Sequence, residues 1–137
     1  MENKNQTESG FRVINLILME SNFKREAVVT FDQDQITPSL KVDVNVQFNE
    51  DSVYVTETIE FAQMNKETQT IEVSAKVQMA GVFEKYGDSP LNVEEFGYVN
   101  GAAIIFPFIR EQLMNLSVKA GITAIVLPPF NFTRKKD

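Results

Sequence analysis

Three segments in the middle of the chain alternate apolar and polar side chains with a period of two residues. They span residues 40–48, 53–61 and 71–79, and short polar stretches separate them. A period of two is typical of a β-strand with one covered and one wet face, and connections this short favour antiparallel hairpins. The side chains expected to face inward are Leu40, Val42, Val44, Val46, Phe48, Val53, Val55, Ile59, Phe61, Ile71, Val73, Ala75, Val77 and Met79. The pattern predicts an antiparallel meander with one dry face.

An earlier segment, residues 11–19, is also expected to be a strand, but both of its alternating sets carry apolar side chains. Such a strand is covered on both faces or lies where another subunit meets it. Residues 20–39 have no clean period and end in a Thr-Pro-Ser turn signal, so they predict an irregular crossover. This crossover is unusually apolar for a connection, because it carries Phe23, Val28, Val29, Phe31 and Ile36.

The period becomes helical from about Ile105, and Gly121 is placed where a left-handed residue ends a helix. One apolar stripe, formed by Ile105, Ile109, Leu113, Leu116 and Ala120, is expected to pack on the dry face of the sheet. Pro107 is expected in the first turn, where its missing N–H has no helical partner. Met114 and Val118 form a second, smaller stripe on the opposite side. A second stripe predicts a contact beyond the domain, and oligomerisation is its simplest source.

The remaining segments read as connections. Gly81 is expected to close the meander, and residues 82–101 read as a loop-rich link because Pro90 and several glycines interrupt them. Residues 122–132 form an extended apolar piece stiffened by two prolines. The predicted fold is therefore α+β: a four-stranded antiparallel sheet, an apolar crossover after the first strand, and one main helix on the dry face.

Length and charge set the domain organisation and the environment. The 137 residues predict one domain over residues 11–132, with a disordered leader at 1–10 and a short polar tail at 133–137. The net charge of −6 argues against nucleic acid as a partner. The polar start has no apolar core like that of a signal peptide, and no stretch approaches the ~18 apolar residues of a spanning helix. A cytoplasmic protein without membrane insertion is expected.

The composition excludes most of the side chains that enzymes use for catalysis. The chain has no His and no Cys, so the commonest general base, the commonest metal ligand and all thiol chemistry are missing. Phosphate-binding glycine loops and hydrolase motifs are also absent. Asp32, Asp34 and Asp51 lack the glycine and closing glutamate of a calcium loop. The sequence therefore predicts a protein that is not an enzyme and has no metal or cofactor.

The order of elements, together with three short motifs, resembles the SecB family of protein-export chaperones. The motifs are Phe106-Pro107-Phe108 at the start of the helix, Ala80-Gly81-Val82-Phe83 after the third alternating strand, and Leu127-Pro128-Pro129-Phe130-Asn131-Phe132 at the end. Their order and spacing carry the resemblance, which covers about residues 11–132. The resemblance implies an ATP-independent chaperone, or holdase, that holds unfolded precursor polypeptides in apolar grooves without a cofactor.

The resemblance also implies a homotetramer built as a dimer of dimers, in which first strands meet at one interface and helices at the other. The implied interface residues are Val13, Leu16, Ile17, Leu18, Met114 and Val118. The implied client-binding groove is lined by Val29, Phe31, Ile36, Phe83, Tyr86, Phe106 and Phe108.

Two departures from the family pattern affect its partners. Family members usually continue with a second helix and an acidic tail, whereas this sequence stops at Asp137. Export-dedicated members also present acidic residues to the translocation motor SecA. Glu20 keeps one such docking position, but Lys24 and Lys76 reverse the charge at two others and Ser74 replaces an apolar contact. Because like charges brought together at an interface are repulsive, these replacements argue against SecA docking in the usual mode.

Two alternatives stay open beside a general export chaperone. A SecB-like chaperone could serve one client, such as the antitoxin of a toxin–antitoxin pair. The same fold could also form a structural or small-ligand-binding homo-oligomer without chaperone activity. Binding of unfolded protein separates the chaperones from the last alternative, and the genes beside this one separate the two chaperones from each other.

Overall fold

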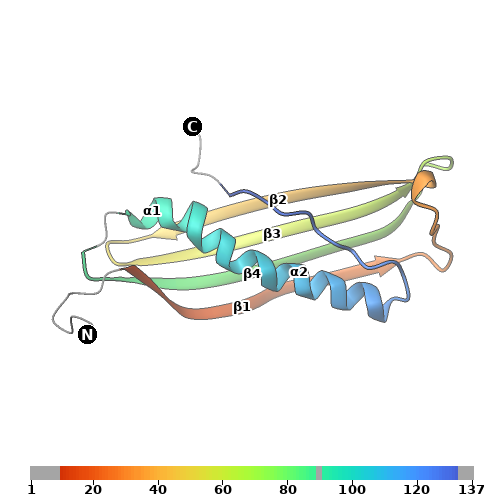
Figure 1. The fold of residues 1–137 in the computed structure, drawn as a ribbon. Coiled ribbons are helices and arrows are strands. Elements are labelled where there is room, and N and C mark those ends of the chain that lie inside the picture. The colour runs from red at the N-terminus through yellow and green to blue at the C-terminus, as the bar shows by residue number, and fades with distance from the viewer. Residues whose placement is uncertain (1–9, 89–90, 133–137) are drawn as a thin grey trace, which may run out of the picture.

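A computed structural model describes residues 10–88 and 91–132, so the predicted leader (except Gly10) and the predicted tail lie outside the described residues. Four strands form one sheet in the order β1-β4-β3-β2, and every neighbouring pair is antiparallel. The strands are β1 (Gly10–Arg25), β2 (Ile36–Phe48), β3 (Ser52–Asn65) and β4 (Ile71–Tyr86). The helical segments lie across one face of this sheet (Figure 1), which confirms the predicted α+β fold.

The crossover is shorter than predicted. Strand β1 continues to Arg25, and β2 already begins at Ile36, so the connection shrinks to residues 26–35 with one 3₁₀ turn, η1 (Gln33–Gln35). The Thr-Pro-Ser turn signal was therefore misleading, because Pro38 lies inside β2, opposite Gln63. A proline is tolerated there because β2 is an edge strand and one side of it needs no ladder hydrogen bonds.

Gly81 does not close the sheet, as predicted, but lies inside β4, which continues to Tyr86. A Cβ atom on Gly81 would lie 2.8 Å from the ring of Phe83 and 3.0 Å from Cδ1 of Ile105. The glycine is therefore explained by close packing between the sheet and the helix above it, and not by a turn.

The link at residues 82–101 is also less irregular than predicted. It contains α1 (Val93–Phe96), capped by the Asn92 side chain, which accepts a 2.7 Å bond from the backbone N–H of Glu95. A π-helical turn, η2 (Gly97–Gly101), then joins α1 directly to α2 (Ala102–Lys119). Pro107 is consequently inside a continuous helical run rather than in a first turn.

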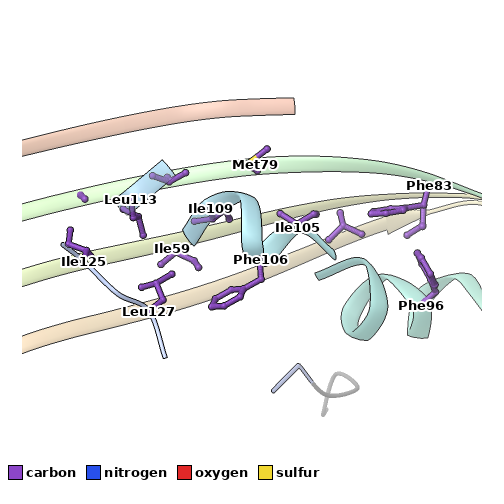
Figure 2. Close-up of a cluster of buried hydrophobic side chains, with 14 of the residues drawn as sticks. Ile59, Met79, Phe83, Phe96, Ile105, Phe106, Ile109, Leu113, Ile125 and Leu127 are labelled. Carbon is purple, nitrogen blue, oxygen red and sulfur yellow. The ribbon is translucent and has the colours of Figure 1, made fainter. Parts of the chain in front are cut away.

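The core lies between the inner face of the sheet, defined as the face that α2 covers, and a second layer. Figure 2 shows the side chains that α2 contributes, of which Ile105, Ile109 and Leu113 are fully buried as predicted. Gly121, with φ of 68°, ends the helical run, and residues 122–132 then return along the inner face toward β2 (Figure 1). Ile125 and Leu127 from this returning segment join the same core.

A buried hydroxyl and a backbone bond, 3.2 Å from the Ile122 N–H to the Ser117 carbonyl, tie the returning segment to the helix. Ser117 Oγ donates a 2.7 Å bond to the Leu113 carbonyl and accepts a 3.0 Å bond from the Ile125 N–H. The second layer therefore consists of α2 and an extended strap, residues 122–132. It does not cover the sheet completely, because Leu40, Phe48 and Ile71, which were expected to face inward under cover, are exposed.

Candidate functional site

The crossover is held on the end of the sheet by a buried carboxylate. Glu72 accepts bonds from the N–H and the hydroxyl of Thr30, both at 2.9 Å, and longer bonds from the amides of Gln63 (3.3 Å) and Asn65 (3.4 Å). The Thr30 N–H contributes most to lowering the pKa of this carboxyl, since it stabilises the charged form. The clamp keeps Val29 buried while Val28 and Phe31 project into solvent.

We expect Glu72→Ala to release the crossover without unfolding the sheet. Losing hydrogen bonds to a charged acceptor should destabilise this region by about 2–3 kcal/mol. Amide hydrogen exchange of residues 26–35 should rise strongly, while exchange in β3 and β4 should change little. Glu67→Ala, which removes an exposed carboxylate from the neighbouring turn, is the matched control.

The same clamp predicts a direction for pH dependence. A carboxyl whose pKa is lowered on folding stabilises the folded state above its ordinary pKa of 4.5, and this stabilisation is lost as the pH falls through the lowered value. Protection of residues 26–35 in the wild type should therefore decrease on acidification below about pH 4.5. If Glu72→Ala leaves the crossover as protected as in the wild type, the clamp is not what holds it.

The residues predicted to line a groove do not share one environment. Phe31 and Phe108 are exposed, at 57% and 44%, whereas Val29, Ile36 and Phe106 are buried and Tyr86 is half-buried. Phe83 is fully buried in the core, so it cannot line an open groove in this conformation. The extension of β4 explains the difference, because it places Phe83 on the inner face beneath the helix.

An aromatic cluster joins the start of α2 to the strap. The ring of Phe106 lies 5.7 Å from that of Phe132 and 6.3 Å from that of Phe130, and the last two rings are 4.7 Å apart. Phe130 is nevertheless exposed, as are Ile104 and Val126 nearby in sequence. The proline-phenylalanine ending was a sequence signal for this cluster, although Phe130 was not among the predicted groove residues.

The predicted interface residues are accessible in the single chain. Strand β1 is an edge strand, and Val13, Ile17 and Leu18 on it are exposed, while Leu16 is half-buried. Sequence reasoning did not include Ile14 and Met19, which are exposed on the same strand. An apolar edge strand has unpaired backbone groups as well as uncovered side chains, so it offers a surface for association.

Helix α2 presents a second accessible patch. Met114 is 39% exposed and Val118 is 70% exposed, on the side of the helix that faces away from the sheet. This agrees with the second stripe in the sequence. Burying the patch requires another molecule or another segment.

The outer face of the sheet has a different character. Glu20, the predicted docking residue, forms a 3.5 Å ion pair with Lys76 across the β1–β4 pair. Beside it, Lys24, Ser74, Ala62 and Ser39 are aligned in one row across the four strands. Small side chains in this row leave a shallow depression of about 680 Å³, whose lining also includes Lys41 and Glu60. The outer face around this row therefore carries charges of both signs, and Glu20 and Lys76 on it are paired with each other.

The described part of the chain offers neither a metal-binding cluster nor a membrane-spanning helix. Residues 10–88 and 91–132 hold no group of three or more His, Cys, Asp or Glu side chains placed to bind a metal ion. Within the same ranges, no helix is long and apolar enough to cross a membrane. The accessible features of these residues are thus apolar surfaces and a polar sheet face.

Comparison with known proteins identifies the class to which this fold and these surfaces belong. Residues 4–134 match the sequence profile of the family described as preprotein translocase subunit SecB. The chain therefore belongs to the SecB family, and the resemblance drawn from its sequence is confirmed.

Individual relatives are distant. The SecB protein-export protein of Legionella pneumophila is 24% identical over 133 residues, which cover 95% of this chain and 81% of the relative. An uncharacterized protein of Methanocaldococcus jannaschii is 26% identical over 100 residues, which cover 72% of this chain and 64% of that protein. The SecB-like chaperone of Mycobacterium tuberculosis, solved with a ChAD peptide from the HigA1 antitoxin, superposes with a TM-score of 0.73 at 13% identity. That superposition covers 88% of this chain and 91% of the chaperone, and it shows a shared fold.

Proposed function

We propose that this protein is an ATP-independent chaperone that binds unfolded or precursor polypeptides on its exposed apolar surfaces. The observation that carries the proposal is the exposure of large apolar side chains along the crossover, the start of α2 and the strap of a SecB-family fold. These residues are Val28, Phe31, Ile104, Phe108, Val126 and Phe130. A client segment laid across them buries apolar area at about 25 cal/mol per Å² without needing a fixed sequence.

The same proposal includes a homotetramer in which two kinds of contact cover the remaining apolar patches. Pairing of β1 edges would satisfy unpaired backbone groups and bury Val13, Ile17 and Leu18, and helix contacts would bury Met114 and Val118. Several weak client sites on one assembly then gain affinity through their high effective concentration. The assembly supplies avidity that a single chain with scattered exposed rings lacks.

Suppression of aggregation of a chemically denatured reporter, in the absence of nucleotide, tests the proposed function. We expect suppression at about one tetramer per reporter chain, because one client occupies several sites at once. Aggregation that proceeds unchanged at a large excess of the protein, at low and at high salt, would favour a structural or small-ligand-binding oligomer instead.

A single dedicated client is the second candidate, and the outer face of the sheet favours it. Lys76 is paired with Glu20, and Lys24 adds a positive charge where export-dedicated relatives are acidic, so both lysines argue against SecA docking in the usual mode. The SecB-like chaperone of Mycobacterium tuberculosis was solved with an antitoxin peptide. Binding measured in parallel to purified SecA and to proteins encoded beside this gene would decide between export and a dedicated antitoxin client.

A further inference from the structure

Glu57 is a carboxyl side chain buried at the centre of the molecule. It occupies an inward position of β3 between Val55 and Ile59, opposite Val44 of β2 and Met79 of β4. Its side chain is 0% exposed, and neither carboxylate oxygen has a hydrogen-bond partner. It is therefore an acid inside an apolar layer.

No charged side chain in the described residues is placed to compensate it. Helix α2 directs Ile105, Ile109 and Leu113 toward the sheet, while its charged residues Arg110, Glu111 and Lys119 are outside the buried stripe. Strap residues 122–132 contain no titratable side chain. Lys85 shares the inner face with Phe83, but it lies at the end of β4, six residues from Met79 opposite Glu57. The other titratable groups point outward or have partners of their own: on β1 Arg12, Glu20, Lys24 and Arg25, on β2 Lys41 and Asp43, on β3 Tyr54 and Glu60, on β4 Glu72, Lys76, Glu84 and Tyr86, and on α1 and η2 Glu94, Glu95 and Tyr98.

The burial of this acid has a defined consequence for its protonation. Desolvation disfavours the charged form and raises the pKa of Glu57 from 4.5 to about 8, so the closed structure holds the carboxyl neutral near pH 7. If water reaches the side chain, its ordinary acidity returns and the proton is lost. Between about pH 4.5 and 8, each rise of one pH unit therefore favours a state in which water reaches Glu57 by about tenfold.

The layer above Glu57 is the part of the fold suited to open. The strap is extended and free of regular structure, and it is joined to α2 by the Ser117 hydroxyl, by a 3.2 Å bond from the Ile122 N–H to the Ser117 carbonyl, and by apolar side chains. The hydrogen bonds between the helix and the sheet involve side chains, from Gln112 Nε2 to Ser21 Oγ and from Arg25 to the Ala120 carbonyl at the C-cap, whereas the strands are joined by backbone ladders. Separation of the layers thus breaks fewer backbone hydrogen bonds than separation of the strands.

We propose that Glu57 couples opening of the layer formed by α2 and the strap to release of a proton, so that this layer loosens as the pH rises through neutrality. The sequence contains no histidine, the side chain that ordinarily titrates in this range. Histidine protonation therefore does not overlap with the response of Glu57. The Glu72 clamp acts in the opposite direction and below its ordinary pKa of 4.5, so it does not contribute near pH 7. This pH-dependent opening does not require a bound client, so the inference goes beyond the proposed function.

Native-state hydrogen exchange between pH 5.5 and 7.5, corrected for the intrinsic exchange rate, tests the proposal. In the wild type, the opening constant of amides in α2 and residues 122–132 should rise about a hundredfold over these two pH units. Glu57→Gln keeps the shape of the side chain but cannot release a proton. In this variant the opening constant should not change with pH. Glu57→Leu, which also removes the polar atoms, should give the same constant profile and guards against a misfolded glutamine variant.

Two results would overturn the proposal. One is an equal pH slope in the wild type and in both variants. The other is an opening constant of equal size, at every pH, for the amides of the layer and for those of β3 and β4, because the layer would then open only by global unfolding. The measurement uses no client, so its outcome is independent of whether the protein binds unfolded chains.

Discussion

Replacing Met114 and Val118 with aspartate is expected to split the assembly into species of half its mass. Both side chains are accessible on α2 in the single chain, and the proposed helix contact would bury them. An aspartate buried there without a partner costs several kcal/mol, so the helix-mediated association should weaken by at least about a hundredfold. Sedimentation velocity and circular dichroism together would show smaller particles with unchanged secondary structure.

The matched control changes the same helix by the same charge. Asn115→Asp with Lys119→Asn also lowers the net charge by two, at exposed positions beside the apolar patch. This control should assemble as the wild type does. If the double-aspartate variant also keeps its mass, α2 does not form the contact and the proposed assembly must use other surfaces.

Replacing Phe31 and Phe108 with aspartate is expected to reduce affinity for unfolded protein by at least about tenfold. Each exposed ring offers apolar area that a bound chain can cover, and a large aromatic side chain contributes about 1–2 kcal/mol when it is covered. Neither ring is fully packed in the core, so the variant should keep a thermal midpoint near that of the wild type. Fluorescence anisotropy of a labelled unfolded protein would measure the loss.

The control for that experiment is Gln33→Asp, which adds one charge to the same crossover without removing an aromatic ring. It should bind nearly as well as the wild type. An unchanged affinity in the double phenylalanine variant would remove the crossover and the start of α2 from the binding surface.

The arrangement of strands followed from periodicity, but their ends did not. Alternation marks where one face is dry, but β1 and β4 continue past the segments that their patterns marked, to Arg25 and Tyr86. Pro38 gave a turn signal although the edge position of β2 tolerates it. Pairing partners, which no local pattern contains, decide these boundaries.

Glycines caused the largest misreading of the helical region. Gly97 and Gly101 suggested a loop, yet a Cβ atom on Gly97 would lie 2.7 Å from Cγ1 of Val46, and one on Gly101 would lie 3.0 Å from Cγ2 of Val55. They are small because the helix lies close to the sheet. Such close approach is a tertiary property, so the sequence alone could not separate it from a loop.

Sequence patterns predicted the candidate site only where an element carries more apolar side chains than one buried face can hold. The second apolar stripe on α2 and the apolar side chains on both faces of β1 predicted accessible patches, because a single domain buries only one face of each element. Phe83 was misplaced once β4 was expected to stop at Gly81, and Glu57 received no role because it interrupts an otherwise apolar face. Whether an isolated polar residue on such a face is solvated or buried depends on what covers the sheet.

The most direct test of the central claim is a footprint of a bound unfolded protein on the wild-type chain. With a reduced and alkylated protein as client and no nucleotide, we expect saturable binding and slower amide exchange in residues 26–35, 102–108 and 126–132. Absence of binding at every ratio tested, or protection confined to the outer face of the sheet around Lys24, Ser74 and Lys76, would contradict it.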